Sequence, residues 1–356
     1  FWGVVPAGGS GTRLLPVSRA SQPKFLLPLL GDRSLLQQTA DRLGDLTSPE
    51  RTMVVCGPAH AAPVARQLPG LPEANVVVEP SPKGTCAAIA LAAALIARQE
   101  PDAVMGSFAA NHDVLDRPAF ARAVRAAVDA AAGWLVTVGL TPTRTETGYG
   151  YIERTDDPVL HAPTGRVFRA ARFVEKPDRA RAEAFVASGR YLWNASMFVW
   201  RVRTFLDELD RLQPALAGGI ARIADAWDTP RRDVIAAEVW SGLPSTSIDE
   251  GIMELSDRVA VVPAAMGWSD VGDWHGLGDL LTRDAAGNSV RADVVQTEAT
   301  NNVVWSGTGR VIALVGLDNL VVVDAPDALL IADRAKAQEV RRIVGLLKDG
   351  DRADRV

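Results

Sequence analysis

Short apolar runs alternate with longer amphipathic stretches through the first 140 residues of the chain. Runs rich in β-branched residues predict buried strands, and the intervening stretches with helical periodicity predict helices. The strands are expected at residues 3–6, 52–56, 75–79, 103–107 and 135–139. The helices are expected at residues 34–43, 59–67, 85–98 and 118–132. This alternation predicts an α/β fold with a mostly parallel sheet that helices cover on both faces.

The pattern changes twice later in the chain. Residues 203–255 have a mainly helical pattern, and a further strand is expected at 259–263. From residue 288, short β runs separated by Gly or Asn turns predict a few coils of a β-helix. These runs are at 301–305, 311–315 and 320–323, and a closing helix is expected at 336–347. We therefore predict two domains, a catalytic domain at 1–285 and a short β-helix tail with its helix at 286–356.

A glycine-rich loop follows the first predicted strand. Glycine adopts positive φ and lets the backbone approach a ligand closely, and successive N–H groups of such a loop can bind phosphate oxygens. Arg13 and Lys24 add two positive charges to this region. Ligands of parallel sheets bind outside the carboxyl ends of the strands, where this loop lies. The predicted nucleotide-binding loop comprises Ala7, Gly8, Gly9, Gly11 and Thr12.

Two other glycine loops are excluded by the residues that follow. A Walker A loop requires Gly-Lys-Ser/Thr, whereas Gly11 precedes Thr12 and Arg13. A dinucleotide-binding loop requires a third glycine at the start of a helix, where this chain has Leu14. A solvated surface turn is the simpler alternative, and the spacing of Arg13 and Lys24 favours a triphosphate site over it.

Composition restricts the class of protein further. Of the 356 residues, 47% are hydrophobic, so a disordered chain is excluded. The net charge of −5 argues against a nucleic-acid-binding protein. Cys56 and Cys86 form no disulfide framework, and the four histidines lack zinc-ligand spacing. With no membrane-length apolar run and no signal peptide at Phe1, we expect a cytoplasmic protein without a membrane partner.

The run GGSGTRLLPVSRASQPKFLLPL resembles the signature of sugar-1-phosphate nucleotidyltransferases. Within that family it is most similar to the mannose-1-phosphate guanylyltransferases, and later motifs extend the resemblance over nearly the whole chain. The resemblance implies a Rossmann-like catalytic domain, a left-handed β-helix tail, and GTP and mannose 1-phosphate as substrates. It also implies Mg²⁺ as cofactor and catalytic roles for Arg13, Lys24 and Asp270. We further expect a homodimer.

The turn after the third strand, Pro80 to Thr85, is a second candidate nucleotide site. Gly84 permits close approach, and Thr85 can cap the helix that follows. A plain helix start is the alternative interpretation. The resembling family places a similar turn against the base and ribose, which implies nucleotide binding by Gly84 and Thr85.

The metal ligands are also implied by the resemblance. The family has Pro-Ala-Asp-His where this chain has Ala109-Ala110-Asn111-His112, and that Asp binds magnesium. Asn111 offers a neutral oxygen, so weaker magnesium binding is expected, with Asp113 as a possible substitute. Asp270 matches the second magnesium ligand, although its Trp- and Gly-rich turn is also compatible with packing alone.

Three motifs resemble the family's sugar-phosphate site. Gly148 and Tyr149 belong to a Gly-Tyr-Gly-Tyr-Ile run, for which a bulged strand is the structural alternative. Glu175 can accept hydrogen bonds from hydroxyls and Lys176 can bind phosphate, but such pairs are usually solvated. Asn194 offers a donor and an acceptor together.

The substrates remain open when only the residue chemistry is considered. Another nucleotide-sugar pyrophosphorylase, using glucose or acetylglucosamine 1-phosphate, has the same chemical needs. A catalytically impaired regulatory homologue is the second alternative, because Asn111 replaces a carboxylate.

Overall fold

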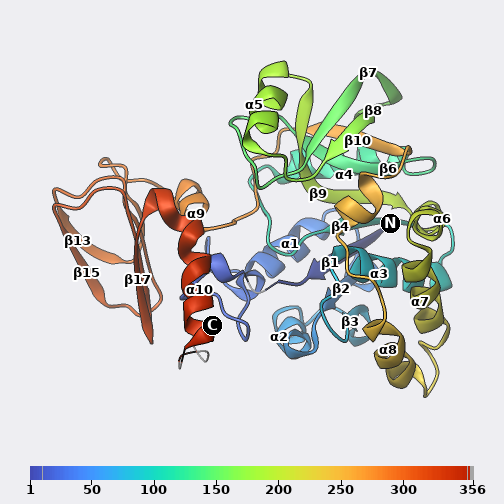
Figure 1. Cartoon of the computed structure of the whole chain (residues 1–356), viewed down its shortest axis with the longest axis horizontal. Helices are drawn as coiled ribbons and strands as arrows, with labels where there is room; N and C mark the ends of the chain where they lie inside the picture. The colour runs from blue at the N-terminus through green and yellow to red at the C-terminus, as the bar shows by residue number, and fades with distance from the viewer. Residues whose placement is uncertain (10, 351, 353–356) are drawn as a thin grey trace. The chain divides into compact units, whose positions relative to one another are not determined.

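The computed structural model describes residues 1–9, 11–350 and 352 (Figure 1). The chain packs as two compact units, and each is described by itself. The first comprises Phe1–Gly8, Thr39–Ala110 and Val114–Trp268, and the second Gly9–Gln38, Asn111–Asp113 and Ser269–Val356. Among the described helices, none combines the length and the apolar character that crossing a membrane requires.

The first unit is built on a nine-stranded sheet with the order β3-β2-β1-β4-β9-β6-β10-β8-β7. Only β8 and β9 run against the other seven strands of this sheet. The predicted mostly parallel sheet is therefore confirmed. The strands are β1 Trp2–Ala7, β2 Thr52–Cys56, β3 Val76–Val78, β4 Val104–Phe108, β6 Leu135–Leu140, β7 Tyr151–Ala162, β8 Gly165–Val174, β9 Tyr191–Arg201 and β10 Val259–Ala264. A separate two-stranded pair is formed by β5 Asp113–Val114 and β11 Trp268–Ser269.

Helices cover this sheet, and the alanine-rich α3 is the most deeply buried. Its small side chains allow close contact with α6 and α7, and they share one core cluster with Trp200 and Phe205. α4 lies outside this cluster and contacts β6, β9 and β10. The helices of the chain are α1 Leu35–Leu43, α2 Pro58–Gln67, α3 Thr85–Gln99, α4 Arg117–Ala130, α5 Arg179–Ser188, α6 Val202–Leu212, α7 Pro214–Asp225, α8 Arg232–Ser241, α9 Trp274–Leu280 and α10 Val340–Asp349.

The second unit contains the predicted β-helix. Asp293 pairs in parallel with Val311, and Val303 with Val321, so these coils advance 18 residues, whereas Ser289 pairs with Val303 after 14 residues. β17 closes the stack by running antiparallel to β16. The β-helix is confirmed, and its left hand stays a prediction. Its strands are β12 Ser289–Arg291, β13 Asp293–Thr297, β14 Val303–Ser306, β15 Val311–Val315, β16 Leu320–Ala325 and β17 Ala328–Asp333.

The core of this unit also takes in residues that precede the β-helix. Leu14, Leu27 and Trp274 share a buried cluster with Val303 and Val321. Packing therefore joins residues 9–38 and 269–285 to the β-helix, whereas the predicted division of the sequence at residue 285 stays a prediction.

Two buried asparagines connect successive coils. The Asn302 amide donates to Asn288 Oδ1 at 3.1 Å and to the Leu317 carbonyl at 3.0 Å, and its Oδ1 accepts from Leu320 N at 2.8 Å. Both asparagine side chains are fully buried, so these turn groups depend on each other rather than on water.

We predict that Asn302→Ala lowers the free energy of unfolding of the C-terminal region by about 2 kcal/mol or more. Leu320 N loses its acceptor, and an unsatisfied group of this kind costs about 1–3 kcal/mol. Asn288 Oδ1 and the Leu317 carbonyl each lose one of two donors, because Asn302 N and Thr300 N still donate to them. Hydrogen exchange of residues 288–325, monitored at increasing urea concentration, measures this free energy of unfolding.

Gln38→Ala is the control, because Gln38 makes an exposed bond to the Arg33 carbonyl and should cost no more than about 0.5 kcal/mol. Equal effects of the two substitutions would show that the buried asparagines do not hold the coils together.

Candidate active site

The residues singled out from the sequence fall into two groups, each inside one compact unit. The second unit holds most of the glycine loop, both cations and both predicted metal ligands, namely Gly9, Gly11, Thr12, Arg13, Lys24, Asn111 and Asp270. The first unit holds Ala7, Gly8, Gly84, Thr85, Gly148, Tyr149, Glu175, Lys176 and Asn194. Ser10, inside the glycine loop, lies outside the described residues.

Gly11 meets two requirements that only glycine satisfies. Its φ is 64°, and a Cβ at this position would lie 2.7 Å from Lys24 Cγ. Its carbonyl oxygen accepts hydrogen bonds from Leu14 N at 2.9 Å and from Ser18 Oγ at 2.5 Å. The loop thereby turns into a short 3-10 helix, Thr12–Leu14, with Arg13 exposed on it.

Lys24 is half-buried. Its Nζ donates to the carbonyl oxygens of Asp270 and Val271 at 3.2 and 3.3 Å. Burial lowers the pKa of Lys24 to about 8; Asp270 opposes this shift, and Arg13 adds to it. Lys24 therefore lies within electrostatic reach of a cation and of the predicted metal ligand, and it is not a solvated surface charge.

The residues around Asp270 fit a cation that takes most of its ligands from phosphates. Asn111 Nδ2 donates to the Asp270 carbonyl at 3.3 Å, which brings the two predicted metal ligands together. Asp273 instead caps α9, since its Oδ1 accepts from Gly276 N at 2.9 Å. The described residues contain no cluster of three His, Cys, Asp or Glu side chains that could enclose a metal. Magnesium is commonly held by one or two carboxylates plus substrate phosphates, and this donor set is compatible with that.

In the first unit, Gly84 and Thr85 connect two loops of the protein. A Cβ on Gly84, whose φ is 81°, would collide with the Thr246 carbonyl oxygen. Thr85 Oγ1 accepts from Ile248 N at 2.9 Å. The prediction that Thr85 caps α3 is wrong, because the loop at 246–248 takes its hydroxyl and Gly84 is the residue before the helix.

Glu79 is a buried residue that the sequence analysis missed. It directly follows β3, is 7% exposed, and its backbone N donates to the Cys56 carbonyl at the end of β2, at 2.9 Å. Its Oε2 is buried without a hydrogen-bond partner among the described residues, and burial raises the pKa of Glu79 to about 7. The sequence did carry a signal for this residue, because an acidic side chain directly follows an apolar strand.

The predicted sugar-phosphate residues gather around a buried carboxyl group. Asn194 Nδ2 donates to Asp249 Oδ1 at 2.8 Å, and Asn194 Oδ1 accepts from Thr137 Oγ1 at 3.0 Å. Burial, and then the charge of Glu175, raise the pKa of Asp249. The sequence analysis missed Asp249, because its neighbours Ser247 and Glu250 have the spacing of a helix cap. That cap does form, since Ser247 Oγ accepts from Glu250 N at 3.1 Å.

Glu175 lies beside this group and has an acceptor to offer. It pairs with Lys176 Nζ at 2.8 Å, while its Oε2 is buried without a partner among the described residues. A Cβ on Gly150 would lie 2.6 Å from that oxygen, so this glycine makes room for the carboxylate.

Tyr149 forms an aromatic wall on the same unit. Its ring packs edge-on against Trp193 and Trp268, with centroids 5.4 and 5.3 Å away. The neighbouring Gly148 donates its backbone N–H to Glu146 Oε1 at 3.1 Å.

A mostly parallel sheet and a glycine loop with a half-buried lysine are features of a nucleotide-binding enzyme. The chain belongs to the nucleotidyl transferase family, whose pattern matches residues 2–286, and residues 292–347 match the MannoseP isomerase/GMP-like beta-helix domain.

Named relatives cover nearly the whole chain. The mannose-1-phosphate guanylyltransferase of Escherichia coli K12 is 40% identical over 99% of this chain and 74% of its own length. The mannose-1-phosphate guanylyltransferase ManC of Salmonella typhimurium is 41% identical over 97% of this chain and 72% of its own. A Thermus thermophilus structure described as a mannose-1-phosphate geranyltransferase aligns with a TM-score of 0.86 and 33% identity, covering 98% of this chain and 99% of that one.

We predict that Lys24→Met abolishes a proton uptake that accompanies GTP binding at pH 8.5. With a pKa near 8, Lys24 is largely neutral at that pH in the free protein. Phosphate anions favour the ammonium form, so binding raises its pKa and draws in a proton. Calorimetry in two buffers of different ionisation enthalpy measures this uptake. The same substitution should reduce turnover at least about a hundredfold, since such a charge contact is worth roughly 3 kcal/mol.

Measurements at pH 6.5 are the internal control, because Lys24 is already charged there and the difference in proton uptake between wild type and variant should vanish. Equal uptake by the variant and the wild type at pH 8.5 would remove Lys24 from the phosphate site.

Proposed function

We propose that the protein transfers a guanylyl group from GTP to mannose 1-phosphate, giving GDP-mannose and pyrophosphate. The observation that carries this proposal is the similarity to relatives of that name over 97–99% of the chain. The half-buried Lys24 beside Asp270 supports the chemistry, because phosphoryl chemistry requires fixed positive charge close to a metal ligand.

In this reaction the phosphate oxygen of mannose 1-phosphate attacks the α-phosphorus of GTP in line, and pyrophosphate leaves. No protein nucleophile is required, so catalysis consists of positioning and of neutralising charge. Arg13 and Lys24 bind the triphosphate, and the N–H groups of the glycine loop bind its oxygens. Ala7, Gly8, Gly84 and Thr85 are proposed to contact the nucleoside through their backbone and the loop that they shape.

Asp270, together with Asn111, is proposed to hold Mg²⁺, and Asp113 is the substitute if Asn111 does not. When bound, the ion neutralises phosphate charge and orients the phosphate oxygens. Asp113 is 7% exposed in β5 and would have to turn toward that site.

The mannose phosphate is assigned to the group around Asp249. Glu175 Oε2 offers an acceptor for a sugar hydroxyl, and Lys176 offers a positive charge for the phosphate. Asn194 is engaged by Asp249 and Thr137, so its proposed role is to hold these groups in place as well as to contact the sugar. Tyr149, with the backbone of Gly148, forms the apolar side of the site.

Glu79 supplies a chemical reason for guanine. The Watson–Crick edge of guanine presents two adjacent donors, N1–H and the 2-amino group, and a carboxylate accepts both. Glu79 lies at the carboxyl end of β3, where ligands of parallel sheets bind. Guanine would donate a hydrogen bond to Glu79 Oε2, which is buried without a partner among the described residues.

Pyrophosphate release from a panel of nucleoside triphosphates and sugar 1-phosphates tests the function directly. The proposal requires that GTP with mannose 1-phosphate gives the highest kcat/KM. A clear preference for glucose or acetylglucosamine 1-phosphate, or for another base, would reject it in favour of another pyrophosphorylase.

We predict that Glu79→Gln lowers kcat/KM for GTP by about 10- to 100-fold, because one acceptor is replaced by a donor facing the 2-amino group. Inosine triphosphate lacks that amino group, so its kcat/KM should fall much less. The ratio of the two kcat/KM values therefore falls in the variant. An unchanged GTP-to-ITP ratio would show that Glu79 does not contact the base.

We predict that Asn111→Asp lowers the magnesium concentration that gives half the maximal rate, since a carboxylate binds this hard cation better than an amide. Magnesium titrations of the initial rate for both proteins measure the shift. Superimposable curves would exclude position 111 as a ligand and leave Asp113. An inactive parent with an active variant would identify a silent regulatory homologue.

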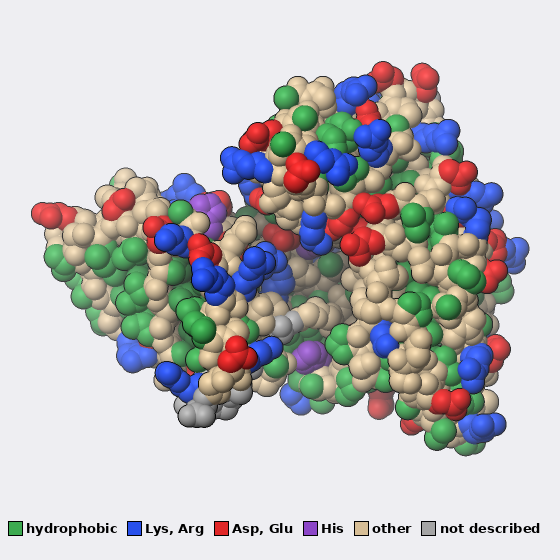
Figure 2. Space-filling model, in the orientation of Figure 1, with side chains coloured by type: hydrophobic (Ala, Val, Ile, Leu, Met, Phe, Trp, Pro, Cys, Tyr) green, Lys and Arg blue, Asp and Glu red, His purple; other side chains and the backbone are tan. Residues whose placement is uncertain are grey.

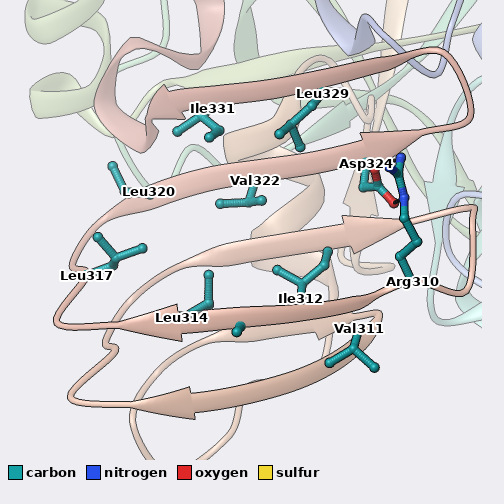
Figure 3. A pocket seen from close by; sticks show the side chains of 11 residues that line it. Arg310, Val311, Ile312, Leu314, Leu317, Leu320, Val322, Asp324, Leu329 and Ile331 are labelled. Carbon is teal, nitrogen blue, oxygen red and sulfur yellow. Dashed lines mark hydrogen bonds and ion pairs between the residues drawn. The ribbon is translucent and has the colours of Figure 1, made fainter.

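We also propose that the protein is a cytoplasmic homodimer. Its two cysteines are free and buried, which suits a reducing compartment. Hydrophobic side chains gather over the strands of the β-helix (Figure 2), where Val295, Val311, Val315, Leu329 and Ile331 are each at least 60% exposed. Several of them line a groove of about 330 Å³ (Figure 3), and such patches commonly mark interfaces. Sedimentation velocity at micromolar concentration measures this state.

A further inference from the structure

The segment between the two catalytic cations is attached to the far end of the sequence. Arg19 lies in a turn closed by two backbone hydrogen bonds with Gln22, both of 3.0 Å. Its guanidinium makes a bidentate pair with Asp327, at 2.7 Å from Nη1 to Oδ2 and 2.5 Å from Nη2 to Oδ1. Asp327 lies in the turn between β16 and β17, 308 residues further along the chain.

The Arg19 side chain also holds its own loop. Its Nε donates to the Pro16 carbonyl at 3.1 Å, so one planar group connects the start of the segment with the β-helix turn. The side chains of Arg19 and Asp327 are 18% and 34% exposed, which makes this pair better shielded than an ordinary surface ion pair.

Other contacts hold the neighbouring backbone in the same unit. The buried Trp274 Nε1 donates to the Leu15 carbonyl at 3.0 Å. Arg291 Nη2 donates to the Gly31 carbonyl, also at 3.0 Å. Leu15 and Arg19 both lie between Arg13 and Lys24, and Arg19 is the nearer to the lysine, five residues before it.

We propose that Arg19 and Asp327 form a positioning pair that holds the segment from Arg13 to Lys24 in its active geometry. The β-helix thereby contributes to turnover through the loop. The proposal rests on the proposed function, because it assumes that Arg13 and Lys24 bind the triphosphate. A displacement of about 1 Å in a catalytic group can cost up to about 100-fold in rate, so a tether of this kind affects kcat more than stability.

The test is a double-mutant cycle with Asp327→Asn, Arg19→Gln and the two changes combined. We expect Asp327→Asn to lower kcat about tenfold at saturating GTP and mannose 1-phosphate, with little change in melting temperature. Because both residues act through one contact, the combined variant should lose no more than the worse single variant. Deuterium uptake of residues 11–24 should rise in all three variants.

Glu100→Gln is the matched control. Glu100 pairs with Arg51 at 2.5 Å, with side chains 37% and 47% exposed, and lies outside the proposed machinery. It should leave kcat and the uptake of residues 11–24 unchanged.

A kcat of Asp327→Asn within twofold of wild type would overturn the proposal. So would losses that multiply in the combined variant, or unchanged deuterium uptake in residues 11–24. Failure of the proposed function would look different, since wild-type protein would then release no pyrophosphate from this substrate pair, while the exchange data would still report on the tether.

Discussion

The hydrogen bonds of one ammonium group organise the second compact unit of this protein. An isolated charge cannot be buried without partners, and Lys24 finds them in the carbonyls of Asp270 and Val271, 246 and 247 residues away in sequence. That contact explains why position 11 is glycine, since the lysine stem occupies the space of a Cβ. It also keeps the lysine close to the carboxylate whose proposed role is to hold magnesium.

The loop that receives Lys24 adopts an unusual backbone conformation. Val271 has φ of 44°, which is rare for a β-branched residue and costs of order 1–3 kcal/mol. Its side chain is fully buried in the cluster with Leu14, Trp274 and Val303. Packing against the β-helix strands therefore holds the strained residue, so that its carbonyl and that of Asp270 both face the ammonium group. Residues 9–38 and the β-helix therefore belong to one compact unit.

The residues proposed to bind the sugar phosphate, in the other unit, carry mainly negative charge. Asp249 and Glu175 are two carboxyl groups in close reach, and their mutual repulsion is tolerated because Asn194, Lys176 and backbone groups surround them. Such a cluster is costly to bury without hydrogen-bond partners, and a hydroxyl-rich ligand would supply further donors. Glu79 likewise has one buried carboxylate oxygen without a partner among the described residues, and its proposed ligand is the base.

Local patterns in the sequence were sufficient for many of the elements before residue 140 and after residue 288, and for the glycine loop. β2 at 52–56 and β15 at 311–315 have the predicted bounds, since apolar runs between turn residues need no distant contact to be recognised. The same holds for Gly11 and Lys24, whose residue types already indicate phosphate chemistry. Tertiary structure decided the partners. The Thr85 hydroxyl accepts from Ile248 rather than capping its own helix, Asn194 binds Asp249, and Arg19 reaches Asp327. These pairings join residues 55 to 308 positions apart, and hydrogen bonds at such separations depend on how the strands and coils stack, which no local periodicity encodes.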